Sequence, residues 1–349
     1  MIEIPSPLRL RIDGEALADN WRALDRLSGA AACGAAVKAD GYGLGAGAVA
    51  RRLADAGCRD FFVATWGEAA ALAPSGLQVS VLHGLRGEDL PAALAGFARP
   101  VLNTAGQVAR WREAGGGACD VMVDTGMNRL GVSPAEVAAG LLDGLSIETL
   151  MSHLARADED GAQARAMNLG QRDAFAALAA STGARRMSLA NSAGIALGRD
   201  YAFDLTRPGL ALYGGVPRPE LAKLVRQVVF PEAQVLQRRR VSAGETVGYN
   251  ATWTAWADAE VAIVNLGYAD GYLRAFSDRG RASFGGAALP VIGRVSMDLV
   301  ALLVDAAPEL AEGDWVTIDY ALRQASAASG LSQYELLTGL GARFGRVWA

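Results

Sequence analysis

The stretch Ala31-Ala-Cys-Gly-Ala-Ala-Val-Lys-Ala-Asp-Gly-Tyr-Gly-Leu-Gly45 joins a short apolar run to a glycine-rich turn. The run from 31 to 37 has the length and small side chains of a buried strand, and the glycines predict a tight turn into a helix. Lys38 stands at the carboxyl end of that strand. Because burial disfavours the charged ammonium, we expect the pKa of Lys38 to be lowered. A neutral lysine amine can attack an aldehyde and form a Schiff base. The alternative is an ordinary lysine that reaches solvent from a strand end.

Short apolar runs alternate with helix-length segments on both sides of this lysine. The expected strands are 31–37, 60–65, 78–82, 99–102, 119–124, 146–152, 186–190 and 203–205, and the expected helices include 44–56, 66–73, 104–115, 134–142 and 160–182. This alternation predicts a parallel sheet covered by helices, and about eight such units match a closed (β/α)8 barrel of the TIM type. An open doubly wound sheet is the alternative, although no Gly-x-Gly-x-x-Gly motif follows the first strand.

The pattern changes near residue 222, where short strands separated by glycine turns replace the alternation. The expected strands are 233–241, 246–248, 260–266, 281–284, 288–293, 299–304 and 315–318, with a short helix around Gln333–Ala342. We therefore expect an α/β chain with two domains, a barrel at 1–222 and a mostly-β C-terminal domain at 223–349.

Composition narrows the class of protein. A net charge of −4 without a basic stripe argues against a nucleic-acid partner, and no apolar window is long enough to span a membrane. The first residues lack the basic and apolar regions of a secretory signal. Three unpatterned cysteines suit a reducing cytoplasm, and two histidines exclude a multi-histidine metal site, so we expect no metal.

Chemically useful residues follow the expected strands at their carboxyl ends, where the catalytic groups of such barrels lie. They occur in Lys38–Tyr42, Asp124–Gly131, Ser152–Ala155, Asn191–Gly194 and Arg207–Gly214. Ser192 and the backbone around Gly209 can form a nest of N–H donors for a phosphate. A Schiff-base lysine beside a phosphate site predicts pyridoxal 5′-phosphate as the cofactor.

These blocks, together with several in the second domain, resemble the alanine racemase family. The blocks are Ala36–Gly43, Asp124–Gly131, Ser152–Ala155, Arg207–Gly214, Gly248-Tyr-Asn250, Gly267-Tyr-Ala-Asp-Gly271, Gly293-Arg-Val-Ser-Met-Asp298 and the segment that begins at Tyr334. They run in the family's order over essentially the whole chain. The resemblance implies a pyridoxal-phosphate enzyme that interconverts L- and D-alanine.

The resemblance also implies a base on each face of the substrate's Cα. Lys38 would carry the cofactor and act on one face, and Tyr249 of the partner subunit would act on the other, in a head-to-tail homodimer with shared active sites. Two bases suit racemisation, because one fixed side chain cannot easily reach both faces of a planar carbanion. A free tyrosine has a pKa near 10, so His153 and Arg207 would favour the phenolate through a hydrogen-bonded chain.

The remaining roles also come from the resemblance. Arg207 would face the pyridine nitrogen, and its guanidinium cannot accept a proton from the ring. Arg129 and Met297 would contact the substrate carboxylate. The cofactor's other contacts would be Tyr42, His153, Asn191, Ser192, Gly209, Leu210 and Tyr334, and the entry path would be lined by Asp158, Tyr268 and Arg294.

One position departs from the family's pattern. Many members have a carbamylated lysine two positions before Asp124, and its negative charge steadies the equivalent of Arg129. This chain has Met122 there, which carries no charge. We expect a bound anion such as chloride, or another polar contact, to hold Arg129 instead. Leu299 also replaces a common glutamine.

Other functions stay open on the sequence alone. A serine or broad-specificity racemase fits the same blocks, because the difference lies in the volume of the pocket. A pyridoxal-phosphate-binding protein without turnover would not need the β-domain, and a decarboxylase would be expected to have an acid in the place of Arg207. Whether the enzyme supplies D-alanine for peptidoglycan or degrades it is also open.

Overall fold

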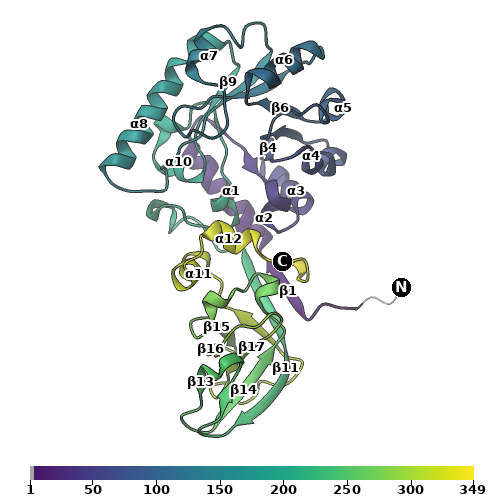
Figure 1. The fold of residues 1–349 in the computed structure, drawn as a ribbon, viewed down its shortest axis with the longest axis vertical. Coiled ribbons are helices and arrows are strands. Elements are labelled where there is room, and N and C mark those ends of the chain that lie inside the picture. The colour runs from purple at the N-terminus through teal and green to yellow at the C-terminus, as the bar shows by residue number, and fades with distance from the viewer. Residues whose placement is uncertain (1–3) are drawn as a thin grey trace. The chain divides into compact units, whose positions relative to one another are not determined.

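The computed structural model describes residues 4–349, apart from the side chains of residues 179 and 180, and forms two compact units (Figure 1). One unit is Leu17–Arg226, and the other combines the chain up to Ala16 with Gln227–Ala349. Helix α1 (Gly14–Ser28) spans the division. The division differs from the expected domains of 1–222 and 223–349 because the N-terminal strand β1 (Leu8–Ile12) pairs with strands of the second unit.

Parallel strands form the first unit in the order β3-β4-β5-β6-β7-β8-β9. Their bounds are β3 (Ala35–Ala36), β4 (Asp60–Val63), β5 (Gln78–Val81), β6 (Arg99–Leu102), β7 (Cys119–Met122), β8 (Ile147–Met151) and β9 (Arg186–Ser188). Two further strands, β2 (Ala32–Cys33) and β10 (Leu205–Thr206), pair in parallel. The backbone N–H of Arg207 donates to Ala190 O at 2.8 Å, which joins β10 to the end of β9 and closes the expected barrel.

Gly34 divides the expected strand 31–37 into β2 and β3. A Cβ at this position would lie 2.8 Å from both the carbonyl oxygen of Asp60 and the ring of Phe62. Only glycine lets β4 approach so closely, and the strand bends there while still pairing on both sides. The carboxyl end of this strand is therefore fixed against its neighbours directly before Lys38.

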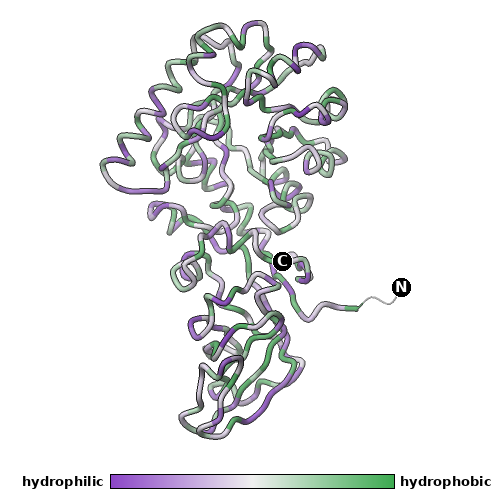
Figure 2. The backbone as a smooth tube through the Cα atoms, in the orientation of Figure 1, coloured by the Kyte–Doolittle hydropathy of each residue, from purple (hydrophilic) through white to green (hydrophobic). Residues whose placement is uncertain are grey.

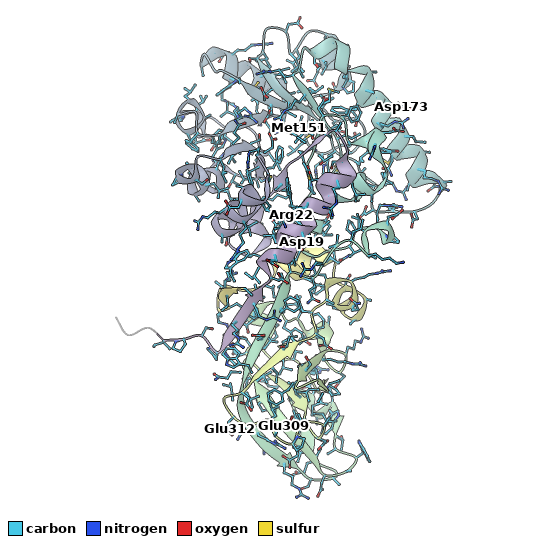
Figure 3. The ribbon with its side chains drawn as sticks, turned by 180° about the vertical axis from the view of Figure 1, so that it is seen from behind. Asp19, Arg22, Met151, Asp173, Glu309 and Glu312 are labelled. Atoms are coloured by element: carbon cyan, nitrogen blue, oxygen red, sulfur yellow. The ribbon has the colours of Figure 1, made fainter. Side chains whose placement is uncertain are left out.

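Helices surround the barrel strands (Figure 1). They are α2 (Lys38–Tyr42), α3 (Ala46–Ala56), α4 (Trp66–Leu72), α5 (Leu90–Leu94), α6 (Ala105–Glu113), α7 (Pro134–Ala138), α8 (Ala162–Ala177), α9 (Ala179–Thr182) and α10 (Ser192–Ala196). The tube of α8 alternates between hydrophilic and hydrophobic colour (Figure 2), as expected of a helix with one buried face. Met151 of β8 lies among the barrel strands, whereas Asp173 projects from α8 into solvent (Figure 3). Strands β4 and β7 are buried along their whole length, because helices cover the sheet.

The second unit is built on antiparallel strands in the order β14-β17-β16-β15-β18-β11, and a further β11–β14 pairing closes them into a second barrel. The bounds of the strands are β11 (Val229–Val241), β12 (Thr246–Val247), β13 (Trp253–Thr254), β14 (Ala259–Val264), β15 (Arg281–Phe284), β16 (Ala287–Ile292), β17 (Val300–Leu303), β18 (Trp315–Ile318) and β19 (Gly345–Trp348). Two helices, α11 (Leu322–Ser329) and α12 (Gln333–Thr338), lie between β18 and β19 in the chain. Strand β1 pairs with both β11 and β19, which adds two strands to one edge.

Within residues 4–349, no helix combines the length and the apolar character needed to cross a bilayer. The expected mostly-β character of the second unit is confirmed, and its strands agree closely with those predicted. Strands β1, β13 and β19 and helices α1 and α11 were not anticipated.

Candidate active site

Lys38 begins a short turn with left-handed backbone geometry. The next four residues all have positive φ: 52° at Ala39, 51° at Asp40, 63° at Gly41 and 56° at Tyr42. A left-handed conformation costs about 1–2 kcal/mol for each residue other than glycine, so other contacts must hold the turn. The side-chain oxygen of Asp40 accepts the N–H of Ala46 at 2.8 Å, and the N–H of Gly41 donates to Val37 O at 2.9 Å. The turn therefore presents Lys38 at the carboxyl end of β3.

The pKa of Lys38 is lowered, as the sequence predicted. Burial of the amine is the largest cause, the positive charge of Arg129 adds to it, and the negative charge of Glu68 opposes it. The side chain keeps an exposed surface even though protein surrounds much of it. Lys38 thus combines access from outside with an amine that loses its proton more readily than a free lysine.

Arg129 lies on a loop that Asp124 holds in place after β7. The Asp124 carboxylate accepts the backbone N–H groups of Gly126, Met127 and Arg129, each at 2.8 Å. Partial burial alone would raise the pKa of Asp124, but these backbone donors outweigh it and the pKa is lowered. Arg129 itself is exposed, and Met122 is buried in β7. The loop therefore orients a solvent-accessible guanidinium whose charge reaches Lys38.

Arg207 lies buried behind the carboxyl ends of β8 and β9, with 7% of its surface exposed. Its guanidinium donates to Ser152 O at 2.6 Å and to the hydroxyl of Ser188. Burial lowers the pKa of Arg207 to about 10, and the negative charge of Asp120 opposes this effect. The group remains a cation at neutral pH.

His153 is a neutral imidazole in this environment. Burial, followed by the positive charges of Arg207, Arg129 and Lys38, lowers its pKa to about 3. Of the two residues expected to favour a phenolate, His153 is therefore neutral and Arg207 carries the positive charge. Gln171 of α8 fixes the backbone around the histidine, since it donates to His153 O at 3.0 Å.

Tyr42, Ser192 and Gly209 surround one small polar cradle. Ser192 Oγ accepts the N–H groups of Gly209 and Ala211 at 3.0 and 3.2 Å. A Cβ on Gly209 would collide with the hydroxyl oxygen of Tyr42, so the cradle needs glycine at this position. The ring of Tyr42 is stacked on Tyr213 with the centroids 4.4 Å apart. The hydroxyls of Tyr42 and Ser192 thus lie against the same stretch of backbone. Hydroxyl groups beside backbone amides can bind a phosphate, so these residues fit that part of pyridoxal phosphate.

Asn191 has a structural partner next to this cradle. Its side-chain oxygen accepts the N–H of Gly194 at 2.9 Å and caps α10. The buried hydroxyl of Ser192 is therefore placed by the start of the helix. Leu210 begins the short 3-10 helix η3 (Leu210–Tyr213), directly after Gly209.

The second unit contains its own group of candidate residues. An open pocket of about 300 Å³ is lined by Tyr249, Asn250, Tyr268, Arg274, Arg294 and Met297. Tyr249 follows Gly248 in the short 3-10 helix η5 (Tyr249–Ala251), and 65% of its surface is exposed. Four residues that the sequence singled out in distant blocks, Tyr249, Tyr268, Arg294 and Met297, thus meet at one pocket.

Backbone contacts bring two of these blocks together. The N–H of Tyr268 donates to Ser296 O at 3.0 Å, and the N–H of Ala269 donates to Met297 O at 3.0 Å. Arg343 stabilises the same arrangement, because its guanidinium pairs with Asp270 at 2.6 Å and with Asp298 at 2.7 Å. The pairing of their backbones thus brings the two blocks together at the pocket.

Two candidates remain to be placed, Tyr334 and Asp158. Tyr334 is on α12, is 41% exposed, and does not line the pocket of the second unit. Asp158 is exposed on the loop after β8.

Sequence reasoning missed several residues that hold the site, namely Glu68, Gln171, Ser188, Arg274 and Arg343. Of these residues, only Glu68 could have been recognised from a sequence pattern, because Thr65 three positions earlier forms a helix capping box with it.

Comparisons with known proteins agree across the whole chain. The family model described as alanine racemase, N-terminal domain, matches residues 12–217, and the one described as alanine racemase, C-terminal domain, matches residues 228–348. A protein named alanine racemase from Acidiphilium cryptum (strain JF-5) is 43% identical over 353 residues, which cover 97% of this chain and 98% of that protein. A protein named alanine racemase, catabolic, from Agrobacterium fabrum (strain C58 / ATCC 33970) is 41% identical and is covered over 91% of its length by 97% of this chain.

A similar structure has also been solved. The alanine racemase of Bartonella henselae with covalently bound pyridoxal phosphate superimposes with a TM-score of 0.89 at 34% sequence identity. The match covers 99% of this chain and all of that chain (100%).

Proposed function

The chain belongs to the alanine racemase family, and on that premise we propose that it interconverts L-alanine and D-alanine with pyridoxal 5′-phosphate bound at Lys38. The observation that carries the proposal is the placement of Lys38. A lysine with a lowered pKa shares one turn with Tyr42, whose hydroxyl lies against Gly209. The N–H of Gly209 donates to Ser192, and these three residues form a cradle suited to a phosphate.

Several residues are proposed to hold the cofactor. Tyr42, Ser192, Gly209 and Leu210 bind its phosphate, with Tyr334 as a further contact. When bound, pyridoxal phosphate supplies a ring that stabilises negative charge at the substrate's Cα. Arg207 contacts the ring nitrogen with a cation that cannot accept a proton, which limits how far charge moves into the ring.

Lys38 and Tyr249 are proposed to move the proton. The lowered pKa leaves more of the Lys38 amine neutral at physiological pH, so that it can accept a proton on one face of Cα. Tyr249 acts on the other face. The positive charge of Arg207 is proposed to favour the phenolate, with the neutral imidazole of His153 as the hydrogen-bonding group that links the two.

Tyr249 is proposed to come from the partner subunit of a homodimer. Its large exposed surface supports this, and so do Trp256 and Met297, which are 90% and 53% exposed in the same unit. Exposed aromatic and apolar residues of this kind are often buried by a second protein chain.

Arg129 and Met297 are proposed to bind the substrate carboxylate. Asp158, Tyr268 and Arg294 line the entry path. A chloride ion beside Arg129 supplies the negative charge that Met122 cannot provide. The proposed location is the cytoplasm, which suits cysteines that are buried and unpaired among the described residues: Cys33, Cys58 and Cys119.

The test is deuterium exchange at Cα, measured with L-alanine in D2O on protein reconstituted with pyridoxal phosphate. The wild type should incorporate deuterium while D-alanine forms, and Tyr249→Phe should lose racemisation most severely from the L side. Protein that binds the cofactor but neither exchanges the proton nor inverts the centre would overturn the proposal in favour of a binding protein.

A further inference from the structure

Glu68 connects the ends of two neighbouring barrel strands. It lies in the first turn of α4, directly after β4. One carboxylate oxygen accepts the N–H of Ala39 at 2.7 Å, and the other accepts the N–H groups of Ala64 and Thr65 at 2.7 and 3.1 Å. A single side chain thus ties the peptide that follows Lys38 to the end of β4.

Ala39 is the first residue of the strained left-handed turn. Its φ of 52° is unfavourable for alanine, and the residue after it has the same geometry. A charged acceptor forms stronger hydrogen bonds than a neutral one, which makes the Glu68 carboxylate an effective brace for such a turn. Because the brace starts directly at the peptide of Lys38, it also fixes where the lysine side chain departs.

Glu68 also balances charge around the lysine. The groups that face Lys38 are the cation Arg129 from the loop after β7, the neutral His153 from the loop after β8, and Glu68 from α4. Arg129 makes a protonated lysine less favourable, and Glu68 makes it more favourable. Without this carboxylate the surroundings of the amine would be cationic or neutral.

We propose that Glu68 is a positioning residue for Lys38, which braces the strained turn that carries the lysine and stabilises the amine once it has accepted a proton. The second half of this role rests on the proposed function of Lys38 as a base. Glu68 itself takes up no proton from the substrate.

Two other capping boxes give a contrast. Glu136 pairs with Ser133 at the start of α7, and Glu335 pairs with Ser332 at the start of α12, each bonding to its own cap residue. Glu68 has the same local role toward Thr65, but it additionally reaches Ala39. Glu136→Gln is therefore a matched control, because it disturbs a capping box of the same kind in the same unit.

The experiment measures how readily the Lys38 amine reacts in the full-length chain without added cofactor. An amine-reactive reagent is applied over a range of pH values, and mass spectrometry quantifies modification at Lys38 and at exposed Lys223, the only two lysines of the chain. Glu68→Gln removes the charge but keeps an acceptor oxygen, so labelling of Lys38 near neutral pH should rise roughly two- to fivefold, the effect of a partly screened charge pair. Labelling of Lys223, and of both lysines in Glu136→Gln, should stay at the wild-type level.

Glu68→Asp separates the brace from the charge. It keeps the negative charge but is one methylene shorter, so it cannot span from Thr65 to Ala39 as glutamate does. Hydrogen exchange of a peptide that covers residues 38–45 should be faster in Glu68→Asp than in the wild type, with a smaller change in Glu68→Gln.

Unchanged labelling in Glu68→Gln, or an equal change in Glu136→Gln, would overturn the proposal and leave Glu68 as a helix cap. If Glu68→Gln does not fold, hydrogen exchange of residues 38–45 in Glu68→Asp tests the proposal instead. Exchange at the wild-type rate in that variant would also overturn the proposal. Both measurements are independent of turnover. An active racemase with unchanged labelling would contradict only the role of Glu68, and an inactive chain with the expected labelling would contradict only the proposed function.

Discussion

His153 lies among three cations, so a further positive charge there is unfavourable. Burial and the charges of Arg207, Arg129 and Lys38 lower its pKa to about 3. A histidine in the unfolded chain takes up a proton near pH 6.5. Between these two values the unfolded state binds more protons than the native state, and stability must fall as the pH is lowered.

Replacing this histidine should therefore flatten the acid side of the stability profile. Between about pH 6.5 and pH 5, His153 contributes a loss of at most about 1.4 kcal/mol per pH unit, and His153→Gln removes this contribution. The measurement is the free energy of unfolding in urea at several pH values. His83→Gln, at the exposed other histidine, is the control. An equal change of slope in both variants would contradict the burial of His153 as the cause.

At the scale of elements, the loop after β7 depends on one carboxylate. Asp124 accepts three backbone N–H groups, and an asparagine offers one acceptor oxygen while placing an amide group against the remaining donors. Asp124→Asn should lower the free energy of unfolding by about 1–2 kcal/mol and raise the KM for alanine, since Arg129 loses its fixed position.

Chemical denaturation and steady-state kinetics measure the two effects. Asp173→Asn, on the outer surface of α8 (Figure 3), is the control and should change neither. If Asp124→Asn raises the KM but leaves the free energy of unfolding unchanged, Asp124 does not act by holding the loop.

The turn between β10 and η3 contains Gly209, which lies against the Tyr42 hydroxyl. A methyl group on Gly209 would overlap the Tyr42 hydroxyl, so Gly209→Ala should push Tyr42 out of the cradle. The dissociation constant for pyridoxal phosphate should rise by at least about tenfold, equivalent to about 1.4 kcal/mol.

Absorbance titration with the cofactor measures this constant, and thermal unfolding of the cofactor-free chain shows whether the fold is intact. Gly170→Ala in α8 is the control, because a Cβ there meets open space. A folded Gly209→Ala with wild-type affinity would exclude this cradle as the phosphate site.

At the scale of the whole molecule, the proposed homodimer predicts that Lys38 and Tyr249 of one active site come from different subunits. If Tyr249 is supplied by the partner subunit, Lys38→Ala and Tyr249→Phe should each be inactive alone. Unfolding and refolding the two together should restore roughly a quarter of the active sites, because half of random dimers are mixed and each has one complete site. Racemisation after mixing is the measurement. Mixing that restores nothing, although mixed dimers are detected, would place both residues of one site on the same chain.

Local patterns were sufficient for most elements of both units. The strands β2 to β9 lie within the expected runs, and β10 overlaps its run at Leu205. Parallel strands covered by helices are largely apolar, and that pattern is visible in the sequence. Strands β1 and β19 were not predicted, because they pair with each other and β1 pairs with β11, and all three lie far apart along the chain. No pattern within Leu8–Ile12 indicates that this segment pairs with residues beyond 227. For that reason the expected domain boundary left the N-terminal segment in the barrel.

The sequence by itself determined the two-domain α/β fold, the alanine racemase family and the residues that carry the proposed chemistry, because these depend on residue type and spacing. The tertiary structure decided the state of each group. Only packing shows that His153 is neutral, that Lys38 follows a strand held at Gly34 and precedes a left-handed turn, and that Glu68 braces that turn from helix α4. The physical reason is that pKa values and backbone strain depend on burial and on charges brought together from distant parts of the chain, which no local pattern specifies.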